Sequence, residues 1–156
     1  METGQQAPDF TLYNTEKTKV SLHDQKGKNV VLLFFPLAFT SVCTGELCSI
    51  RENISLYDNA NAVVFGISID SLFTLKKYKE SMGLNFELLS DFNKTVSNDY
   101  GALYDVFPTF EMEGVTKRAA FVIDKEGLIR YAEVCPTPQH LPDFNAIQAK
   151  LAELNA

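Results

Sequence analysis

Three residues at fixed spacing, Pro36, Thr40 and Cys43, could together carry out nucleophilic chemistry. A cysteine thiolate is a strong nucleophile, and a thiol ionises readily in the first turn of a helix, where backbone N–H groups and the helix dipole stabilise an anion. The threonine hydroxyl can hydrogen-bond to the sulfur or to an incoming oxygen. The proline supplies a rigid wall and removes a competing backbone donor. The pattern therefore predicts a reactive thiolate at Cys43.

The neighbouring sequence predicts that Cys43 stands at a strand-to-helix junction. Val30–Phe35 is a continuous β-prone run, typical of a strand covered on both faces, and Pro36 ends it. Thr40 or Ser41 would cap a following helix. The apolar stripe of that helix recurs at spacings of three and four and consists of Cys43, Leu47, Ile50, Ile54 and Tyr57.

The rest of the chain alternates further strands and helices, with a loop expected over residues 106–116. The predicted strands cover residues 9–13, 19–22, 62–69, 86–89, 119–123 and 128–134. A helix capped by Ser71 and ended by Gly83 and a short helix over 96–100 follow two of these strands. The final helix has an apolar face formed by Leu141, Phe144, Ile147, Leu151 and Leu154.

This order of elements indicates an α/β fold. Buried strands joined by helices imply a central sheet with helices on both faces. A βαβ unit followed by an antiparallel hairpin and a helix is the thioredoxin-like arrangement. We therefore expect residues 1–156 to form one domain with a thioredoxin-like fold, a central mixed sheet and an N-terminal β-hairpin. A fold class alone leaves the function open.

The spacing P-x-x-x-T-x-x-C formed by Pro36, Thr40 and Cys43 resembles the active-site signature of the peroxiredoxins, the alkyl hydroperoxide reductase and thiol-specific antioxidant family. The likeness extends from Ala7 to the C-terminal helix and is closest to the one-cysteine alkyl hydroperoxide reductase E type. Segments similar to that type are Phe34–Thr40, Gly66–Ser68 and Leu89–Phe92. The resemblance implies a thiol-dependent peroxidase, an antioxidant oxidoreductase that needs neither a metal nor an organic cofactor.

The resemblance also implies the groups that assist Cys43. Arg118 matches the family's R-x-x-F-V-I-D pattern, and its guanidinium would bring a permanent charge and several donors to the peroxide oxygens. Glu46 resembles the helix carboxylate that orients this arginine; a solvated carboxylate is the alternative. The Cys43 thiolate would attack hydrogen peroxide or an organic hydroperoxide and become a sulfenic acid. Thr40, the backbone N–H groups near Val42 and Cys43, and Arg118 would stabilise the departing oxygen.

Two further cysteines leave three routes for resolving the sulfenic acid. The bacterioferritin-comigratory type often has a cysteine five residues after the first, and Cys48 stands there. Cα atoms five residues apart on a helix are separated by ~8–9 Å, beyond the ~7 Å limit of an unstrained disulfide. A Cys43–Cys48 bond, our first choice, therefore requires the helix to unwind, which Gly45 makes easier. Cys135, before Pro136, could be the partner or a buried small hydrophobe, and a one-cysteine mechanism is the third route.

Three aromatic residues, Phe39, Phe107 and Phe110, are candidates for the rim of a substrate pocket or for a dimer contact. The resemblance implies a homodimer. It also implies a thiol reductant such as thioredoxin, glutaredoxin or a low-molecular-weight thiol.

Composition argues against several partners. The net charge of −6, with no Lys/Arg-rich run, disfavours nucleic acid and anionic membrane surfaces. The longest apolar runs are too short to span a bilayer. The first six residues lack the basic and apolar regions of a secretory signal, so we expect a cytoplasmic protein.

Other kinds of site and function are less favoured. His23 and His140 are isolated, without a paired carboxylate motif, and are expected at the surface. Cys43 and Cys48 match no common zinc pattern, and the lack of a C-x-x-C motif weakens a dithiol site. The alternatives are a thioredoxin-like disulfide oxidoreductase without peroxidase activity, or a binding protein with an inert thiol. The first would reduce a model disulfide without peroxide, and the second would keep Cys43 unchanged under mild peroxide.

Overall fold

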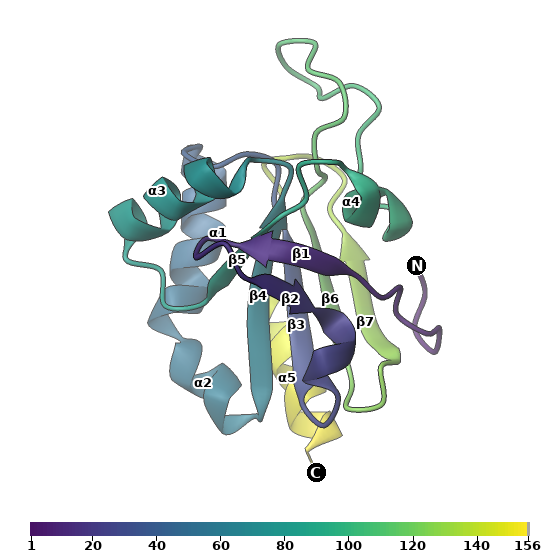
Figure 1. The fold of residues 1–156 in the computed structure, drawn as a ribbon. Helices are drawn as coiled ribbons and strands as arrows, with labels where there is room; N and C mark the ends of the chain where they lie inside the picture. Colours follow the sequence, from purple (N-terminus) through teal and green to yellow (C-terminus); the bar gives the residue numbers. More distant parts are fainter. Residues whose placement is uncertain (156) are drawn as a thin grey trace.

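The computed structural model describes the backbone of residues 1–155 and the side chains of residues 1–40 and 45–155. Within these residues a seven-stranded sheet has the order β2-β1-β5-β4-β3-β6-β7 (Figure 1). The strands are β1 (Thr11–Asn14), β2 (Lys19–Ser21), β3 (Asn29–Phe34), β4 (Ala62–Ser68), β5 (Glu87–Ser90), β6 (Ala119–Ile123) and β7 (Ile129–Val134). The helices are the 3-10 turn η1 (Leu22–Gln25), α1 (Ser41–Glu52), α2 (Ile54–Asn59), α3 (Leu72–Met82), α4 (Thr95–Asp99) and α5 (Phe144–Leu154).

Strand β3 lies inside the sheet, between β4 and β6, and is buried on both faces, as its apolar run predicts. It pairs parallel with β4 and antiparallel with β6, and β4 pairs parallel with β5. Successive side chains of a strand point to opposite faces. Val31 and Leu33 accordingly belong to one apolar core, whereas Leu32 and Phe34 belong to another. The predicted N-terminal hairpin is also confirmed, because β1 pairs antiparallel with β2 and joins the sheet through β5.

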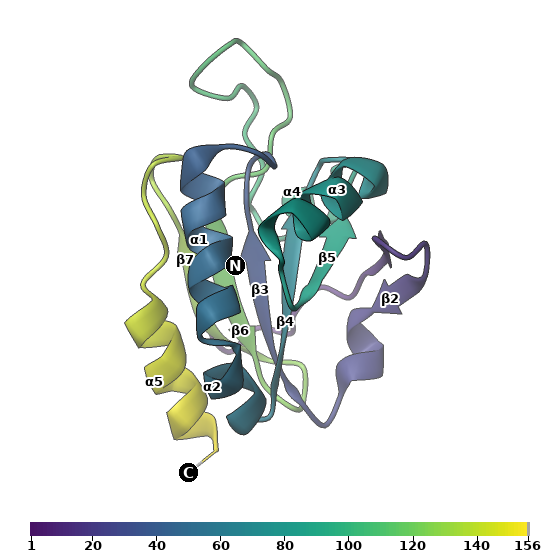
Figure 2. The ribbon, with the colours of Figure 1, turned by 90° about the vertical axis from the view of Figure 1, so that its left-hand side faces the viewer.

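Helices cover both faces of the sheet. The core on one face includes apolar residues of α1, α2, α3 and α5, and Figure 2 shows α1 and α5 together to the left of strands β3 and β4. The core on the other face includes residues of α4, η1 and the N-terminal segment. Among the described residues, no helix has both the length and the apolar character needed to cross a membrane.

The sequence predicts one long helix after Pro36, and this prediction is wrong in one respect. The structure has two helices, α1 and α2, separated at Asn53. Asn53 has φ −115° and ψ 17°, outside helical geometry. Its side-chain amide donates a hydrogen bond to the Ser49 carbonyl at 2.8 Å. This side-chain bond competes with the backbone ladder and ends the helix, although Tyr57 still reaches the core that the apolar stripe predicts.

The final helix is shorter than its apolar stripe suggests. Asp143 caps α5 by accepting a hydrogen bond from the Ala146 N–H at 3.0 Å. Pro142 precedes this cap. Leu141 therefore lies outside the helix and is 42% exposed, contrary to its predicted place on the buried face.

The parallel strands β3, β4 and β5 end at the same edge of the sheet, and the loops after them meet there. Figures 1 and 2 show the segment between α4 and β6 projecting from this edge as a long loop, which confirms the loop predicted over residues 106–116. In open α/β sheets, ligands bind outside the carboxyl ends of the strands. The edge that follows β3 is therefore where a site is expected.

We predict that Leu33→Ala lowers the free energy of unfolding by about 2–5 kcal/mol, because it leaves a cavity beside the central strand. Leu33 is fully buried. Leu56→Ala is the matched control, since Leu56 is 48% exposed on α2, and it should change stability by less than about 0.5 kcal/mol. Urea unfolding of the reduced protein measures both. Equal losses for the two variants would contradict the layered core.

Candidate active site

The loop between β3 and α1 is held in place at both ends. Pro36 is buried at its start. Thr40, the N-cap residue of α1, has extended backbone angles, and its hydroxyl donates to the Leu37 carbonyl at 3.2 Å. Between them the Ala38 N–H donates to the Asp70 carboxylate at 2.8 Å. The chain thus enters α1 through a fixed turn.

Asp70 is a supporting residue that the sequence reasoning missed. It follows β4, and its carboxylate accepts a second hydrogen bond from the Ser68 hydroxyl at 3.0 Å. Burial raises the pKa of Asp70, while the Ala38 and Ser68 hydrogen bonds oppose that rise. A serine and an aspartate just beyond a buried strand were the available signal, because such residues commonly hydrogen-bond to nearby loop backbone.

Arg118 and Glu46 form a buried ion pair. Arg118 directly precedes β6, and its Nη1 donates to Glu46 Oε2 at 2.7 Å. Their side chains are 1% and 0% exposed, so the alternative of a solvated Glu46 carboxylate is wrong. Arg118 Nε also donates to the Pro138 carbonyl at 2.9 Å. These contacts orient the guanidinium.

Burial raises the pKa of Glu46 to about 7, although the positive charge and hydrogen bond of Arg118 act in the opposite direction. Glu46 Oε1 is buried and accepts no hydrogen bond from the described residues. A buried carboxylate with one unsatisfied oxygen pays a desolvation cost that a single ion pair offsets only in part.

A pocket of about 200 Å³ brings Pro36, Thr40 and Arg118 together. Its remaining wall combines one more residue of the β3–α1 loop with residues of the projecting loop and residues that follow β7. These residues are Leu37, Phe107, Thr109, Phe110, Met112, Pro138 and Gln139. The lining is largely apolar around one guanidinium and a few polar groups, which suits a small ligand with a polar reactive end.

Two of the three aromatic residues predicted for a rim or a dimer contact lie in the wall of this pocket. Phe107 and Phe110 line the pocket, and Phe110 is 84% exposed. Phe39 is not among the lining residues, because its backbone has a left-handed φ of 66° and its ring packs edge-on against Tyr78 at a centroid distance of 5.0 Å. Met112, Pro138 and Gln139 carry no motif that would have identified them as pocket residues.

The structure describes the side chains of Cys48 and Cys135 but not that of Cys43. Cys43 is the third residue of α1, and its side chain lies outside the described residues, as do those of Ser41, Val42 and Thr44. Cys48 is a half-buried free thiol on the same helix. Cys135 is a buried free thiol that follows β7. Burial, together with the negative charges of Glu133 and Glu46, raises the pKa of Cys135 to about 12.

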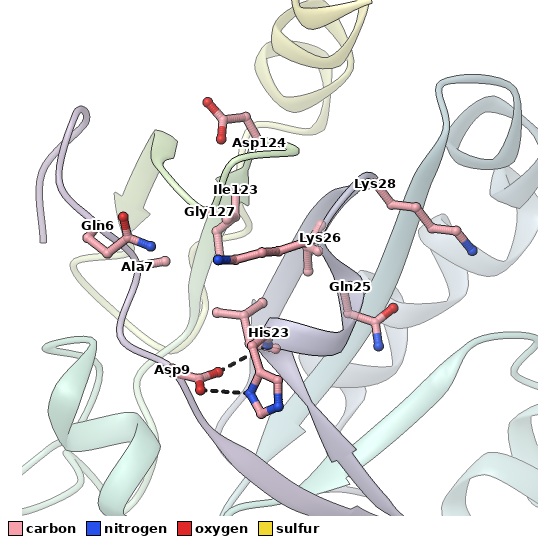
Figure 3. Close-up of a pocket in the computed structure, with 12 residues that line it drawn as sticks. Gln6, Ala7, Asp9, His23, Gln25, Lys26, Lys28, Ile123, Asp124 and Gly127 are labelled. Carbon is pink, nitrogen blue, oxygen red and sulfur yellow. Dashed lines mark hydrogen bonds and ion pairs between the residues drawn. The ribbon is translucent and has the colours of Figure 1, made fainter.

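The two histidines are exposed, as predicted, but His23 does have carboxylate partners. His23 Nδ1 lies 2.8 Å from Asp9 Oδ2, and Nε2 lies 3.4 Å from Asp24 Oδ1. Figure 3 shows the Asp9–His23 pair at the edge of a separate pocket of about 150 Å³, with the Lys26 side chain extending across it toward Gly127. No cysteine lines this pocket. Among the described residues, no cluster of His, Cys, Asp and Glu is placed to hold a metal ion.

Comparisons with known proteins agree with this geometry. Residues 3–132 match the AhpC/TSA family. Alkyl hydroperoxide reductase E of Mycobacterium tuberculosis is 39% identical, covering 100% of this chain and 99% of that protein. The putative peroxiredoxin bcp of Coxiella burnetii is 41% identical, covering 83% and 85%. The crystal structure of the peroxidoxin BcpB of Mycobacterium tuberculosis has a TM-score of 0.87 at 26% identity, covering 100% and 99%.

The family match and the relatives identify an oxidoreductase built on the thioredoxin-like fold that uses a thiol to reduce peroxides. The chain belongs to the AhpC/TSA family and is a peroxiredoxin. The predicted family, fold class and peroxidase function are thereby confirmed, and the comparisons give no support to a disulfide oxidoreductase without peroxidase activity.

We predict that rising pH weakens the native state through Glu46. Its native pKa of about 7 exceeds its usual value of 4.5, so the native state binds this proton more tightly. The stability that results is fully present below about pH 4.5 and is lost as the pH rises through 7. The free energy of unfolding of the wild type relative to Glu46→Gln should fall by about 1–3 kcal/mol between pH 5 and pH 8. A relative gain over that interval would contradict the prediction.

Proposed function

We propose that Cys43 is the peroxidatic nucleophile and that Thr40, Arg118 and Pro36 form its reaction site. The observation that carries the proposal is the pocket at the start of α1, which gathers Pro36, Thr40 and Arg118 from distant parts of the chain. Cys43 stands in the first turn of that helix, where the helix dipole favours a thiolate. Glu46 orients Arg118 and does not itself line the pocket.

The proposed reaction is a displacement on oxygen. The Cys43 thiolate forms a bond to the terminal oxygen of ROOH, the O–O bond breaks, and its electron pair leaves with the RO oxygen. The product is a cysteine sulfenic acid, and RO⁻ takes up a proton to give an alcohol, or water when R is hydrogen. Arg118, and the Thr40 hydroxyl once it turns from the Leu37 carbonyl, would stabilise the charge that develops on the departing oxygen.

The pocket supports both hydrogen peroxide and organic hydroperoxides as substrates. Leu37, Phe107, Phe110 and Met112 provide an apolar wall next to Arg118. An apolar R group would contact this wall, while its hydroperoxide end points toward the start of α1. Hydrogen peroxide needs only the polar groups.

We propose Cys48 as the first choice for resolving the sulfenic acid. Both Cys43 and Cys48 belong to α1, so a disulfide requires the first turns of this helix to unwind. Gly45 is exposed between them, and a Cβ at that position would meet no neighbouring atom. Cys135 is less suited, because its burial and raised pKa oppose formation of the attacking thiolate. A one-cysteine mechanism remains the alternative.

Several broader properties remain proposals. We propose that residues 1–156 act as one domain, as a homodimer in the cytoplasm. The reductant is a thiol of the thioredoxin, glutaredoxin or low-molecular-weight type. Support for a thioredoxin-type reductant comes from the thioredoxin-dependent peroxide reductase of Drosophila melanogaster, which is 35% identical over 144 residues.

We predict that Cys43→Ser abolishes peroxide reduction while the protein stays folded, because a serine hydroxyl does not ionise near neutral pH. Peroxide consumption with an excess of thiol reductant measures the activity, and circular dichroism checks the fold. Cys135→Ser is the matched control and should retain activity. Appreciable turnover by purified Cys43→Ser would disprove the assignment.

We predict that Arg118→Met slows the oxidation of Cys43 by at least ~100-fold, since one preorganised charged donor in a shielded site contributes ~3 kcal/mol. The pKa of Cys43 should rise because a neighbouring positive charge is lost. Arg130→Met is the control, because Arg130 is 40% exposed and pairs with Asp124 instead. A wild-type rate constant for Arg118→Met would show that another arginine acts.

Peptide mapping after one equivalent of peroxide should reveal a Cys43–Cys48 disulfide and leave Cys135 as a free thiol. Cys48→Ser should instead accumulate the sulfenic acid. The prediction fails if the wild type keeps a persistent sulfenic acid, or forms a mixed disulfide with an added small thiol while Cys48 stays free.

A further inference from the structure

Residues 135–143 join β7 to α5, and we call this segment the strap. Its first residue extends the β6–β7 pairing, since the Cys135 N–H donates to the Arg118 carbonyl at 2.9 Å. The strap then passes the pocket, where Pro138 and Gln139 form part of the wall. The segment therefore lies against both the backbone and the side chain of Arg118.

The strap supplies a fixed contact to the Arg118 guanidinium, in addition to the contact from Glu46. The Pro138 carbonyl accepts from Nε at 2.9 Å, and Glu46 accepts from Nη1 at 2.7 Å. A guanidinium is planar and its donors have fixed directions. Two acceptors at different nitrogens fix its rotation within the plane, which a single ion pair does not.

Packing alone does not hold the strap down. Cys135, Pro138 and Pro142 are buried, but the other residues from 136 to 141 face solvent. These exposed residues are Pro136, Thr137, Gln139, His140 and Leu141. Hydrogen bonds at its two ends therefore add to the packing of these three residues in holding the strap.

The Glu133 carboxylate ties the far end of the strap to β7. Its Oε1 accepts hydrogen bonds from the Asp143 N–H at 2.9 Å and from the Tyr131 hydroxyl at 2.8 Å. Glu133 belongs to β7, and Asp143 is the last residue of the strap. One side chain thus closes the loop that carries Pro138.

We propose that Glu133 is a positioning residue for the peroxidase reaction, because by closing the strap it holds the Pro138 carbonyl against Arg118. The proposal rests on the proposed role of Arg118. Without Glu133, Asp143 still caps α5, but the strap loses its side-chain tie to β7, and the Pro138 carbonyl is then held less firmly at Nε while Glu46 stays at Nη1.

The first test compares Glu133→Ala with Glu133→Gln in stopped-flow oxidation by hydrogen peroxide. Glu133→Ala should slow the reaction ~10-fold, because small misplacement of a catalytic group is costly, and should raise the pKa of Cys43, followed by thiolate absorbance. Glu133→Gln keeps an oxygen acceptor and should react near the wild-type rate. A purely structural role would lower the melting temperature without moving the Cys43 pKa.

A second pair of variants avoids any change in β7. Asp143→Ala and Asp143→Pro both remove the side-chain cap of α5. Only proline also removes the backbone N–H that donates a hydrogen bond to Glu133. The φ of −81° at Asp143 is compatible with proline. Asp143→Pro should therefore be slower than Asp143→Ala, and equal rates would overturn the proposal.

The Arg118→Met background separates this proposal from the function on which it rests. Glu133→Ala should slow Arg118→Met no further, because Glu133 acts through the guanidinium. If Arg118→Met is slow while Glu133→Ala keeps the wild-type rate and Cys43 pKa, the strap proposal alone fails. The same holds if the effect of Glu133→Ala is undiminished in Arg118→Met. If Arg118→Met reacts at the wild-type rate, the role of Arg118 and this proposal fail together.

Discussion

Burial of two opposite charges, Arg118 and Glu46, constrains the whole site. An isolated buried charge costs several kcal/mol, so each group requires the other to stay in place. The pair joins α1 to the start of β6, across the core between the helix and the sheet. Because α1 also carries Cys43, the ion pair sets the distance between the helix start and the guanidinium.

Other contacts refine this arrangement at the same edge of the sheet. Asp70 holds the turn that enters α1 through the Ala38 N–H, and the Pro138 carbonyl, which follows the end of β7, accepts a hydrogen bond from Arg118. The Arg118 side chain is only 1% exposed, so solvent screens its charge little and its electrostatic effect on a nearby thiolate is strengthened. The fold therefore places a cation and a helix start beside one another, and the chemistry of a thiol peroxidase follows from that placement.

Local patterns predicted what depends on local physics. The apolar run of β3, the Ser71 cap and the Gly83 stop of α3 were all readable from the sequence. What the sequence did not show depends on contacts between distant segments, such as Asp70 with Ala38. Asn53 interrupts the predicted helix because its side-chain amide donates a hydrogen bond to the Ser49 carbonyl. The spacing of apolar residues carries no information about this hydrogen bond. Arg118 was found through family resemblance, since no spacing rule relates it to Cys43.

The most direct test of the account is a double-mutant cycle on the ion pair, measured as the rate of Cys43 oxidation by hydrogen peroxide. Glu46→Gln should slow the wild type, because Arg118 loses its charged partner. In the Arg118→Met background the same change should have little further effect on the rate, since Glu46 acts only through Arg118. If the double variant is slower by the full product of the two single rate reductions, the claim that the buried pair organises the site is contradicted.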